Sequence, residues 1–499
     1  MSVSFDYIIV GAGSAGSIVA GKLSANPSFR VLLVEAGGST DRYPQVWDAN
    51  QINCLYDIPQ IHWGYKSQPL RYMNNRVMDV WRAKIEGGCT THNDMVYTRG
   101  APADFDDWVK SYGCTGWSYN EVAQNFAAVE AVLRPTTTTE NAFGRDFVNA
   151  CLDLGIPYNP NYNSGGPLLG VSPHQSTIEN GNRRVTSFQK YVAPFLGRRP
   201  NLTVVTDALV NRILFSGTRT IGVNLTITGS TQDVFANREV ILSAGSINNP
   251  QLLMLSGIGA ADALKTQGID PLVDLPGVGE NMQDALIFKG VWPTRQPITG
   301  QPANLGYAVV WDHPEDAQQP QVCLEMTRGI YDCNQPTPVL EGNYVVTGGA
   351  MRQRSRGRVR LASYDPRVAP IIDMNLLSAP GDYEQCRLAF ETMRRVGNSP
   401  GLSAWRLAER IPGPNVVTEE QIRQWILNNT YSYSHPSGTC AMKAGGLSGG
   451  VVDPRLRVYG VTGLRVVDVS IMPRITSGHT QGPAFMIGDK GADMILQDA

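Results

Sequence analysis

The pattern of apolar and polar positions is clearest in the first 35 residues. Residues 7–10 form an apolar run of strand type, followed by a glycine-rich turn and an alanine-rich stretch that predicts a helix to about Ala25. A second apolar run, residues 31–34, ends at Glu35. The order strand, turn, helix, strand predicts a parallel β-α-β unit.

The turn in this unit has the spacing Gly11-x-Gly13-x-x-Gly16. Glycines there permit a tight turn and let backbone N–H groups approach a pyrophosphate at the start of the helix. Glu35 follows 19 residues after Gly16, where an acid can bind ribose hydroxyls. The motif predicts a dinucleotide with an unphosphorylated ribose, NAD or FAD rather than NADP. The residues expected to bind it are Gly11, Gly13, Ser14, Ala15, Gly16, Glu35 and Ala36.

Two later segments repeat the combination of an apolar strand and a turn. Residues 240–242 predict a strand, followed by a small-residue turn at 244–246 and a helix that ends near Gly257. Residues 464–467 predict another strand, which ends at Asp468.

The chain between these segments has a different character. Residues 286–345 are rich in proline and polar side chains and lack the strand–glycine–helix pattern. After Arg352 the sequence alternates as an antiparallel strand does and then turns at prolines. Residues 383–396 have the periodicity of an amphipathic helix.

Composition narrows the class of protein. A chain of 499 residues is too long for one compact core and suggests about two to four domains. The net charge of -2, without a run of lysine or arginine, argues against nucleic-acid or anionic-membrane binding. Residues 7–21, the most apolar N-terminal window, are too few for a membrane span and lack signal-peptide features, so we expect a cytoplasmic protein. Eight scattered cysteines without a C-x-x-C pair argue against a zinc site, and we expect no metal.

Five separate segments, residues 1–35, 82–100, 238–259, 435–442 and 459–495, together resemble the glucose–methanol–choline (GMC) oxidoreductase family from end to end. The resemblance implies an FAD-dependent enzyme that oxidises alcohols. It implies an α/β fold in which a Rossmann-like FAD-binding domain is interleaved with a substrate domain, built on an antiparallel sheet flanked by helices. Two departures are Asn249 before Pro250, where the family has Ser or Thr, and the Glu86–Cys89 segment, where it has Leu-Gly-Gly-Ser.

The same resemblance implies a discontinuous layout. Residues 1–150, 200–285 and 435–499 are expected to form the FAD-binding domain. Residues 151–199 and 286–434 are expected to form the substrate-binding domain.

Two of the six histidines are the candidate catalytic residues. His435 lies in the segment Ser-His-Pro-Ser-Gly-Thr, and the family's histidine at that position faces the reactive edge of the flavin. Oxidation of an alcohol needs a base near the hydroxyl with a pKa near the working pH, and a neutral imidazole fits. His479 matches a second active-site position and is assigned an orienting role, with the role of base as the alternative. His62, His174 and His313 are expected to have structural or surface roles.

The resemblance also implies further flavin contacts. Asn93 matches an asparagine that lies against the flavin, and choline oxidases join a histidine in the position of His92 covalently to the 8α-methyl carbon of FAD. His92 is therefore expected to be covalently linked, with simple packing on the ring as the alternative. Asp468 and Val210 are expected near FAD, although a turn former and a core residue are alternatives for them. The remaining cofactor-binding candidates are Gly88, Val96, Ala244, Gly245, Thr480 and Gln481.

The expected function is an FAD-dependent alcohol oxidase in which oxygen accepts the electrons and gives hydrogen peroxide. Alternatives are a dehydrogenase with another acceptor, a hydroxynitrile-lyase-like flavoprotein without redox turnover, and an NAD-dependent dehydrogenase, which rests on the first motif alone. The substrate is expected to be a small alcohol, with sugars, aryl alcohols and simple primary alcohols open and choline not favoured. Trp311, Tyr331 and Tyr344 are either a pocket wall or core aromatics. The protein is expected to be a monomer or homodimer.

Overall fold

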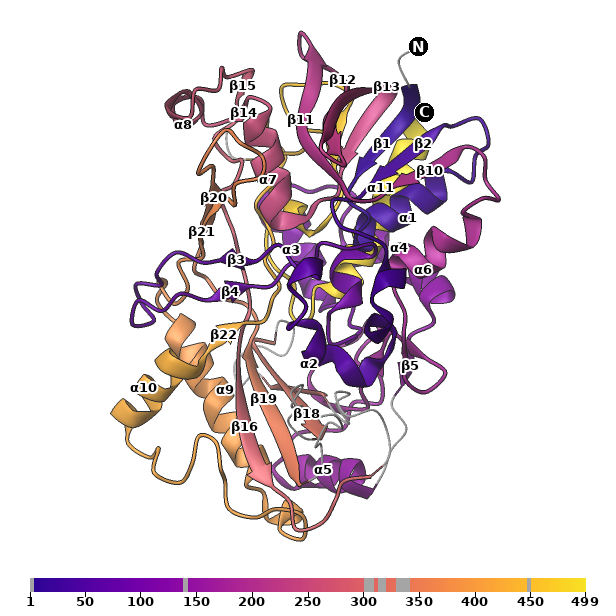
Figure 1. Cartoon of the computed structure of the whole chain (residues 1–499). Helices are drawn as coiled ribbons and strands as arrows, with labels where there is room; N and C mark the ends of the chain where they lie inside the picture. The colour runs from indigo at the N-terminus through magenta and orange to yellow at the C-terminus, as the bar shows by residue number, and fades with distance from the viewer. Residues whose placement is uncertain (1–3, 138–141, 300–308, 313–319, 329–341, 447–449) are drawn as a thin grey trace.

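The computed structural model describes residues 4–137, 142–299, 309–312, 320–328, 342–446 and 450–499. Its elements gather around two large sheets, which lie in the upper and lower parts of Figure 1. Among the described residues, no helix combines the length and apolarity needed to cross a bilayer.

The first sheet has seven strands in the order β10-β2-β1-β13-β12-β11, with β23 also paired to β13. The pairs among β10, β2, β1, β13 and β23 are parallel, and β11, β12 and β13 form an antiparallel meander. The bounds are β1 (Ser4–Val10), β2 (Val31–Val34), β10 (Leu202–Val205), β11 (Ala208–Ser216), β12 (Arg219–Ile227), β13 (Ser230–Leu242) and β23 (Leu464–Val466). The predicted β-α-β unit is confirmed, with α1 (Ser14–Leu23) as its helix.

Helices cover this sheet closely. A Cβ added at Gly488 of α11 (Gln481–Asp498) would lie 2.8 Å from the Ala15 Cα of α1, so the two helix backbones approach each other there. Other helices of the upper part are α3 (Pro102–Tyr112), α4 (Tyr119–Leu133), α6 (Ser187–Tyr191), α7 (Gly245–Leu255) and α8 (Ala261–Thr266). The predicted helix after residue 246 corresponds to α7 and ends two residues earlier than expected.

The second sheet is antiparallel, in the order β22-β16-β19-β18-β17-β6. Its strands are β6 (Gly170–Ser172), β16 (Leu286–Pro293), β17 (Val309–Asp312), β18 (Val322–Arg328), β19 (Asn343–Ala350) and β22 (Tyr431–Ser432). The predicted amphipathic helix is α9 (Asp382–Gly397), which packs on one face of this sheet together with α5 (Ala142–Asp153) and α10 (Glu419–Asn429). On the opposite face, Ile287 of β16 and Cys323 of β18 pack in a smaller core cluster with Tyr433.

Short elements complete the described chain. The strand predicted after Arg352 is a small hairpin of β20 (Arg358–Arg360) and β21 (Ile371–Asp373). The others are α2 (Ile52–Leu55), β3 (Tyr65–Lys66), β4 (Asp79–Val80), β5 (Thr136–Thr137), β7 (Gln175–Ser176), β8 (Ile178–Glu179), β9 (Arg183–Arg184), β14 (Ile258–Gly259) and β15 (Val273–Asp274).

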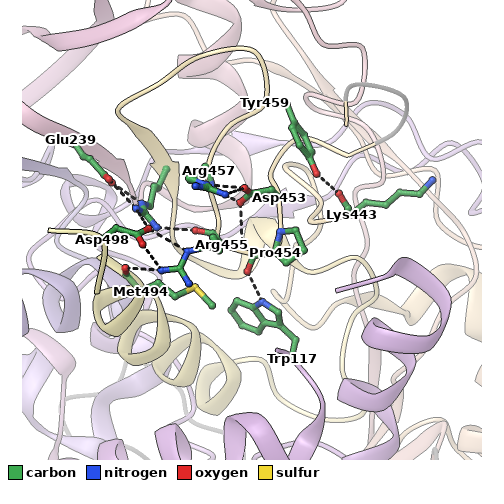
Figure 2. Close-up of polar contacts among 11 residues, drawn as sticks. Trp117, Glu239, Lys443, Asp453, Pro454, Arg455, Arg457, Tyr459, Met494 and Asp498 are labelled. Carbon is green, nitrogen blue, oxygen red and sulfur yellow. Dashed lines mark hydrogen bonds and ion pairs between the residues drawn. The ribbon is translucent and has the colours of Figure 1, made fainter. Parts of the chain in front are cut away.

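A buried ion network ties the C-terminal helix to the first sheet. Arg465 of β23 is almost fully buried and binds Glu239 of β13 at 2.6 Å and Asp498 at the end of α11 at 2.7 Å. Arg455 holds the same Asp498 at 2.7 Å. Figure 2 shows Asp498 bonded to Arg455, with the Trp117 indole bonded to the Pro454 carbonyl nearby.

The division into two domains stays a prediction. Two of the helices pack in the core of the other sheet from the one that the predicted boundaries imply. Phe188 and Tyr191 of α6 pack in the core of the first sheet, although residues 151–199 were expected in the substrate domain. Phe143 and Phe147 of α5 pack in the core of the second sheet, although residues 1–150 were expected in the FAD-binding domain.

Candidate active site

A cavity of about 520 Å³ is lined by the glycine turn after β1 and, on the second sheet, by Ile287 and Lys289 of β16. Its walls hold both candidate catalytic histidines and all the predicted cofactor-binding residues except Gly16. The predicted residues that line it are Gly11, Gly13, Ser14, Ala15, Glu35, Ala36, Gly88, His92, Asn93, Val96, Val210, Ala244, Gly245, His435, Asp468, His479, Thr480 and Gln481. Segments that lie more than 400 residues apart in sequence thus meet around one space.

The glycine turn forms one end of the cavity. Gly11 has a φ of 102°, and a Cβ on Gly88 would lie 2.7 Å from the Gly13 Cα, so both positions require the bare backbone. The N-terminus of α1 has no side-chain cap, which leaves its N–H groups for a ligand. Gly16 lies off the cavity and serves packing, because a Cβ there would meet the Gly11 carbonyl oxygen at 2.0 Å.

Glu35 stands at the end of β2 beside this turn. Its carboxylate accepts hydrogen bonds from the backbone N–H of Ala12 at 2.9 Å and of Gly37 at 2.8 Å. Burial raises the pKa of Glu35 to about 7, and the hydrogen bonds from Gly37 and Ala12 oppose that rise. Val210 of β11 is buried and reaches the same end of the cavity, so it is both a core residue and a lining residue.

Asp468 both forms a turn and lines the cavity. Its oxygens accept from the backbone N–H groups of Gly245 at 2.7 Å and Ser470 at 2.9 Å. Asn249 donates to Asp468 at 2.8 Å, and its amide oxygen accepts from the N–H of Ala244 at 2.8 Å. The asparagine that departs from the family pattern therefore holds the turn after β13 against the end of β23.

The wall beside the opening of α11 contains His92 and Asn93. Asn93 donates to Gln481 at 3.0 Å and accepts from the buried Arg184 at 2.8 Å. The Gln481 Nε2 is buried without a partner among the described residues, and so is the His92 Nδ1. Burial lowers the pKa of His92 well below its usual range, with the charge of His62 as a smaller cause in the same direction.

His435 follows the short strand β22. Its backbone N–H donates to the buried Asp284 carboxylate at 2.9 Å, and its ring stacks on Tyr433 with centroids 4.8 Å apart. The ring of His479 lies edge-on to it at 5.0 Å. Burial lowers the pKa of His435 well below its usual range, and the charges of His479 and Arg82 act in the same direction. The imidazole is therefore neutral at ordinary pH.

Glu325 of β18 is bound to this pair. One oxygen lies 2.5 Å from the His479 Nε2, and the other accepts from the Tyr433 hydroxyl at 2.9 Å. Although burial acts to raise it, the charge of His479 and its hydrogen bond bring the pKa of Glu325 down to about 2. The Glu325 carboxylate, which is ionised at every working pH, thus fixes the His479 ring directly. It also fixes the His435 ring indirectly, because it binds Tyr433, on which the His435 ring stacks.

The sequence analysis missed several polar residues of this site. Glu325, Asp284, Tyr433 and Arg184 were not singled out, and neither were the cavity-lining residues Asp94, Lys289 and Tyr431. Glu325 and Lys289 are lone charges inside otherwise apolar runs, VCLEM and LIFKGVW. A charge in a buried strand needs a partner or a function, and that signal could have found both.

The remaining expectations have mixed outcomes. Tyr344 packs in the core, stacked on Trp292 at 5.4 Å, so the core alternative is confirmed. His62 lies against Tyr56 and bonds the Leu55 carbonyl at 2.8 Å, outside the cavity lining, and His174 is buried. Tyr331, His313 and the side chain of Trp311 lie outside the described residues.

Comparisons with known proteins show the family to which the chain belongs. The N- and C-terminal sequence models of the GMC oxidoreductases match residues 5–287 and 353–488. The chain therefore belongs to the GMC oxidoreductase family, as its motifs indicated, and is an FAD-dependent oxidoreductase acting on CH–OH groups.

Individual relatives span nearly the whole chain. It is 34% identical to an oxygen-dependent choline dehydrogenase of Pseudomonas aeruginosa, over 99% of this chain and 95% of the relative. Among solved structures, pyridoxine 4-oxidase from Mesorbium loti is 30% identical, with a TM-score of 0.90 and 99% of both chains covered. A formate oxidase structure is 25% identical, with a TM-score of 0.90 and coverage of 100% of this chain and 99% of that one.

The residues present fit FAD. The bare backbone at Gly13 and Gly88, the uncapped start of α1 and the buried acid Glu35 are what a dinucleotide pyrophosphate and ribose require. At the other end of the cavity, the unpartnered Gln481 Nε2 offers a hydrogen-bond donor to a polar ring.

Proposed function

We propose that this protein oxidises a small alcohol to a carbonyl compound, with His435 taking the hydroxyl proton and oxygen acting as the final electron acceptor. The observation that carries the proposal is the pair of imidazoles, 5.0 Å apart, which line the same cavity as the dinucleotide turn. A hydroxyl placed between the two rings would contact a base on one side and a hydrogen-bond donor on the other.

His435 suits the role of base because its ring is neutral and it lines the cavity. The stacked Tyr433 fixes the plane of the ring, and the Asp284 carboxylate fixes its backbone. A fixed acceptor of this kind contributes about 10²–10⁴-fold to a proton transfer.

His479 suits the orienting role because Glu325 holds its Nε2 and supplies a negative charge. A protonated His479 would present its other ring N–H to a substrate oxygen as negative charge develops there. The alternative is that Glu325 strengthens His479 as the base. The two assignments differ in which substitution abolishes proton removal.

FAD, when bound, supplies the acceptor for the hydride that leaves the alcohol carbon, at flavin N5, and passes the two electrons on. Oxygen as their acceptor would give hydrogen peroxide. The names of similar proteins support this choice, since they include an oxygen-dependent choline dehydrogenase and two oxidases.

We also propose that His92 is joined covalently to the 8α-methyl carbon of FAD. His92 lines the cavity, burial keeps its ring neutral, and its Nδ1 has no partner among the described residues. Acid precipitation of the purified protein should leave the yellow colour in the pellet, and His92→Ala should release it. Colour wholly in the supernatant would show that His92 only packs on the ring.

The test of the proposed reaction is anaerobic mixing of the holoenzyme with a panel of sugars, aryl alcohols and simple primary alcohols. At least one should bleach the flavin absorbance, and air should restore the colour with release of peroxide. His435→Asn should lower the bleaching rate about 10²–10⁴-fold, because an amide cannot accept the proton. His479→Asn keeps a hydrogen-bonding side chain, so it should lower the bleaching rate by a smaller factor. If His479→Asn is the more severe change, His479 is the base, and if no alcohol bleaches the flavin, the reaction is not alcohol oxidation.

A further inference from the structure

The face of the second sheet that meets the cavity carries one polar row across three strands. Lys289 of β16 pairs with Thr347 of β19, and Thr347 pairs with Glu325 of β18. Side chains of directly paired residues share one face of a sheet. With one strand between them, Lys289 and Glu325 lie about 10 Å apart along the row. Glu325 is hydrogen-bonded to His479 and Tyr433. The row therefore begins beside the candidate catalytic histidines and ends at Lys289.

Lys289 is placed to act on a ligand. It is the one exposed residue of β16, whose other positions are buried or half-buried, and its side chain lines the cavity. Tyr431, on the neighbouring strand β22, also lines the cavity and pairs with Ile287, one residue pair away from Lys289 on the same face. The phenol of Tyr431 is the main cause that raises the pKa of Lys289, so the ammonium stays protonated.

The ammonium has no carboxylate of its own. Among the described residues, Lys289 forms no ion pair within 4.0 Å. Asp94 lines the same cavity and influences both Lys289 and His479 from beyond that distance, and burial raises its pKa. An ammonium that lines a cavity without a paired carboxylate is open to an anionic group of a ligand.

We infer that Lys289 and Tyr431 form a recognition subsite for an anionic oxygen on the alcohol substrate, such as a carboxylate or phenolate. This inference rests on the proposed alcohol oxidation and names the class of substrate for it. The hydroxyl would lie at the His435–His479 pair and the anionic oxygen at Lys289, across the row. Alcohols that carry a quaternary ammonium would meet the lysine charge and be rejected.

The expected effect follows from hydrogen bonds to charged groups. Such a bond changes binding about 10- to 100-fold when one partner is removed. Lys289→Met introduces an uncharged side chain of similar length. It should therefore weaken the binding of an anionic alcohol by about that factor and leave the binding of a neutral alcohol almost unchanged. Tyr431→Phe should show a smaller loss in the same direction.

The experiment compares 4-(hydroxymethyl)benzoate, 4-methylbenzyl alcohol and 4-(hydroxymethyl)-N,N,N-trimethylanilinium as reductants of the anaerobic holoenzyme. These probes share the aryl alcohol and differ in charge at the far end. The measured quantity is the ratio of bleaching rate constant to apparent dissociation constant. The wild-type protein should prefer the anion, and Lys289→Met should reduce that preference. Lys265→Met, an exposed lysine on α8 far from the cavity, is the matched control and should change nothing.

Outcomes separate the inference from the function on which it rests. If the probes bleach the flavin but the cation is preferred, or Lys289→Met leaves the preference for the anion intact, the subsite is wrong while alcohol oxidation stands. A cation preference that Asp94→Asn abolishes would assign recognition to Asp94 instead. If none of the three probes, nor any neutral alcohol of the wider panel, bleaches the flavin, the proposed function fails and the subsite falls with it.

Discussion

Replacement of Glu325 by glutamine tests how the second sheet controls the two histidines. The change keeps the size of the side chain and removes its charge. The wild-type carboxylate binds the His479 Nε2 with one oxygen and the Tyr433 hydroxyl with the other. An amide can accept from only one of them, and it offers no charge to stabilise an imidazolium. Glu325→Gln should therefore weaken the donor that His479 presents to the substrate.

The magnitude can be worked from the pKa of Glu325. After the opposing effect of burial, the fall from 4.5 to about 2 corresponds to a net stabilisation of the carboxylate by about 3 kcal/mol, to which His479 contributes most. Because the pKa is depressed in the folded protein, this contribution to stability is present above pH 4.5 and is lost as the pH falls toward 2. If about half of it acts on the reacting oxygen, the rate of flavin bleaching should fall roughly tenfold.

The assay is anaerobic stopped-flow bleaching of the holoenzyme between pH 5 and 9, with the FAD content of each variant measured first. Glu325→Gln should lower the rate, since the carboxylate that binds the His479 Nε2 is lost. Tyr433→Phe is the matched control, because it removes the other hydrogen bond of Glu325 and leaves the charge in place. A Glu325→Gln enzyme with the wild-type rate and pH profile would refute the orienting role.

Three further predictions concern binding and stability. Gly88→Ala should abolish FAD retention, measured by absorbance after gel filtration, because the new Cβ would lie 2.7 Å from the Gly13 Cα, and retained FAD would contradict the close approach. Arg465→Met should lower the free energy of unfolding by about 1.5–3 kcal/mol, because Glu239 loses its ion pair while Asp498 keeps only Arg455, and urea titration followed by flavin fluorescence measures this loss. Asn249→Leu should weaken FAD binding through the Asp468 turn more than Asn249→Ser does, and equal affinities would argue against that support.

Much of the first sheet could be predicted from local pattern. The apolar run at 31–34 matches β2 residue for residue, because a strand buried on both faces by parallel neighbours needs only a continuous apolar run. The strand at 240–242 was correctly placed, but β13 begins ten residues earlier, at Ser230. That extension is antiparallel and half-exposed, with polar side chains that carry no apolar run to mark it.

Some residues of the candidate site could likewise be predicted from the sequence, and others could not. Glycines and acids around the cofactor are local signals, because a tight turn and an adjacent helix start constrain the residue at each position. The family resemblance singled out His435 and His479, and the structure places their rings 5.0 Å apart. By contrast, no spacing in the sequence connects Glu325 with His479, 154 residues away.

The sequence by itself thus determined the dinucleotide turn, the parallel unit around it and the family of the enzyme, since each follows from short-range backbone geometry or from motifs read in order. Only the tertiary structure decided which charged side chains face the reacting groups. Lys289 and Glu325 share a row because β16, β19 and β18 pair in one register, and a shift of one residue would turn either side chain to the opposite face. Register is set by packing over the whole sheet, and no local stretch of the chain contains it.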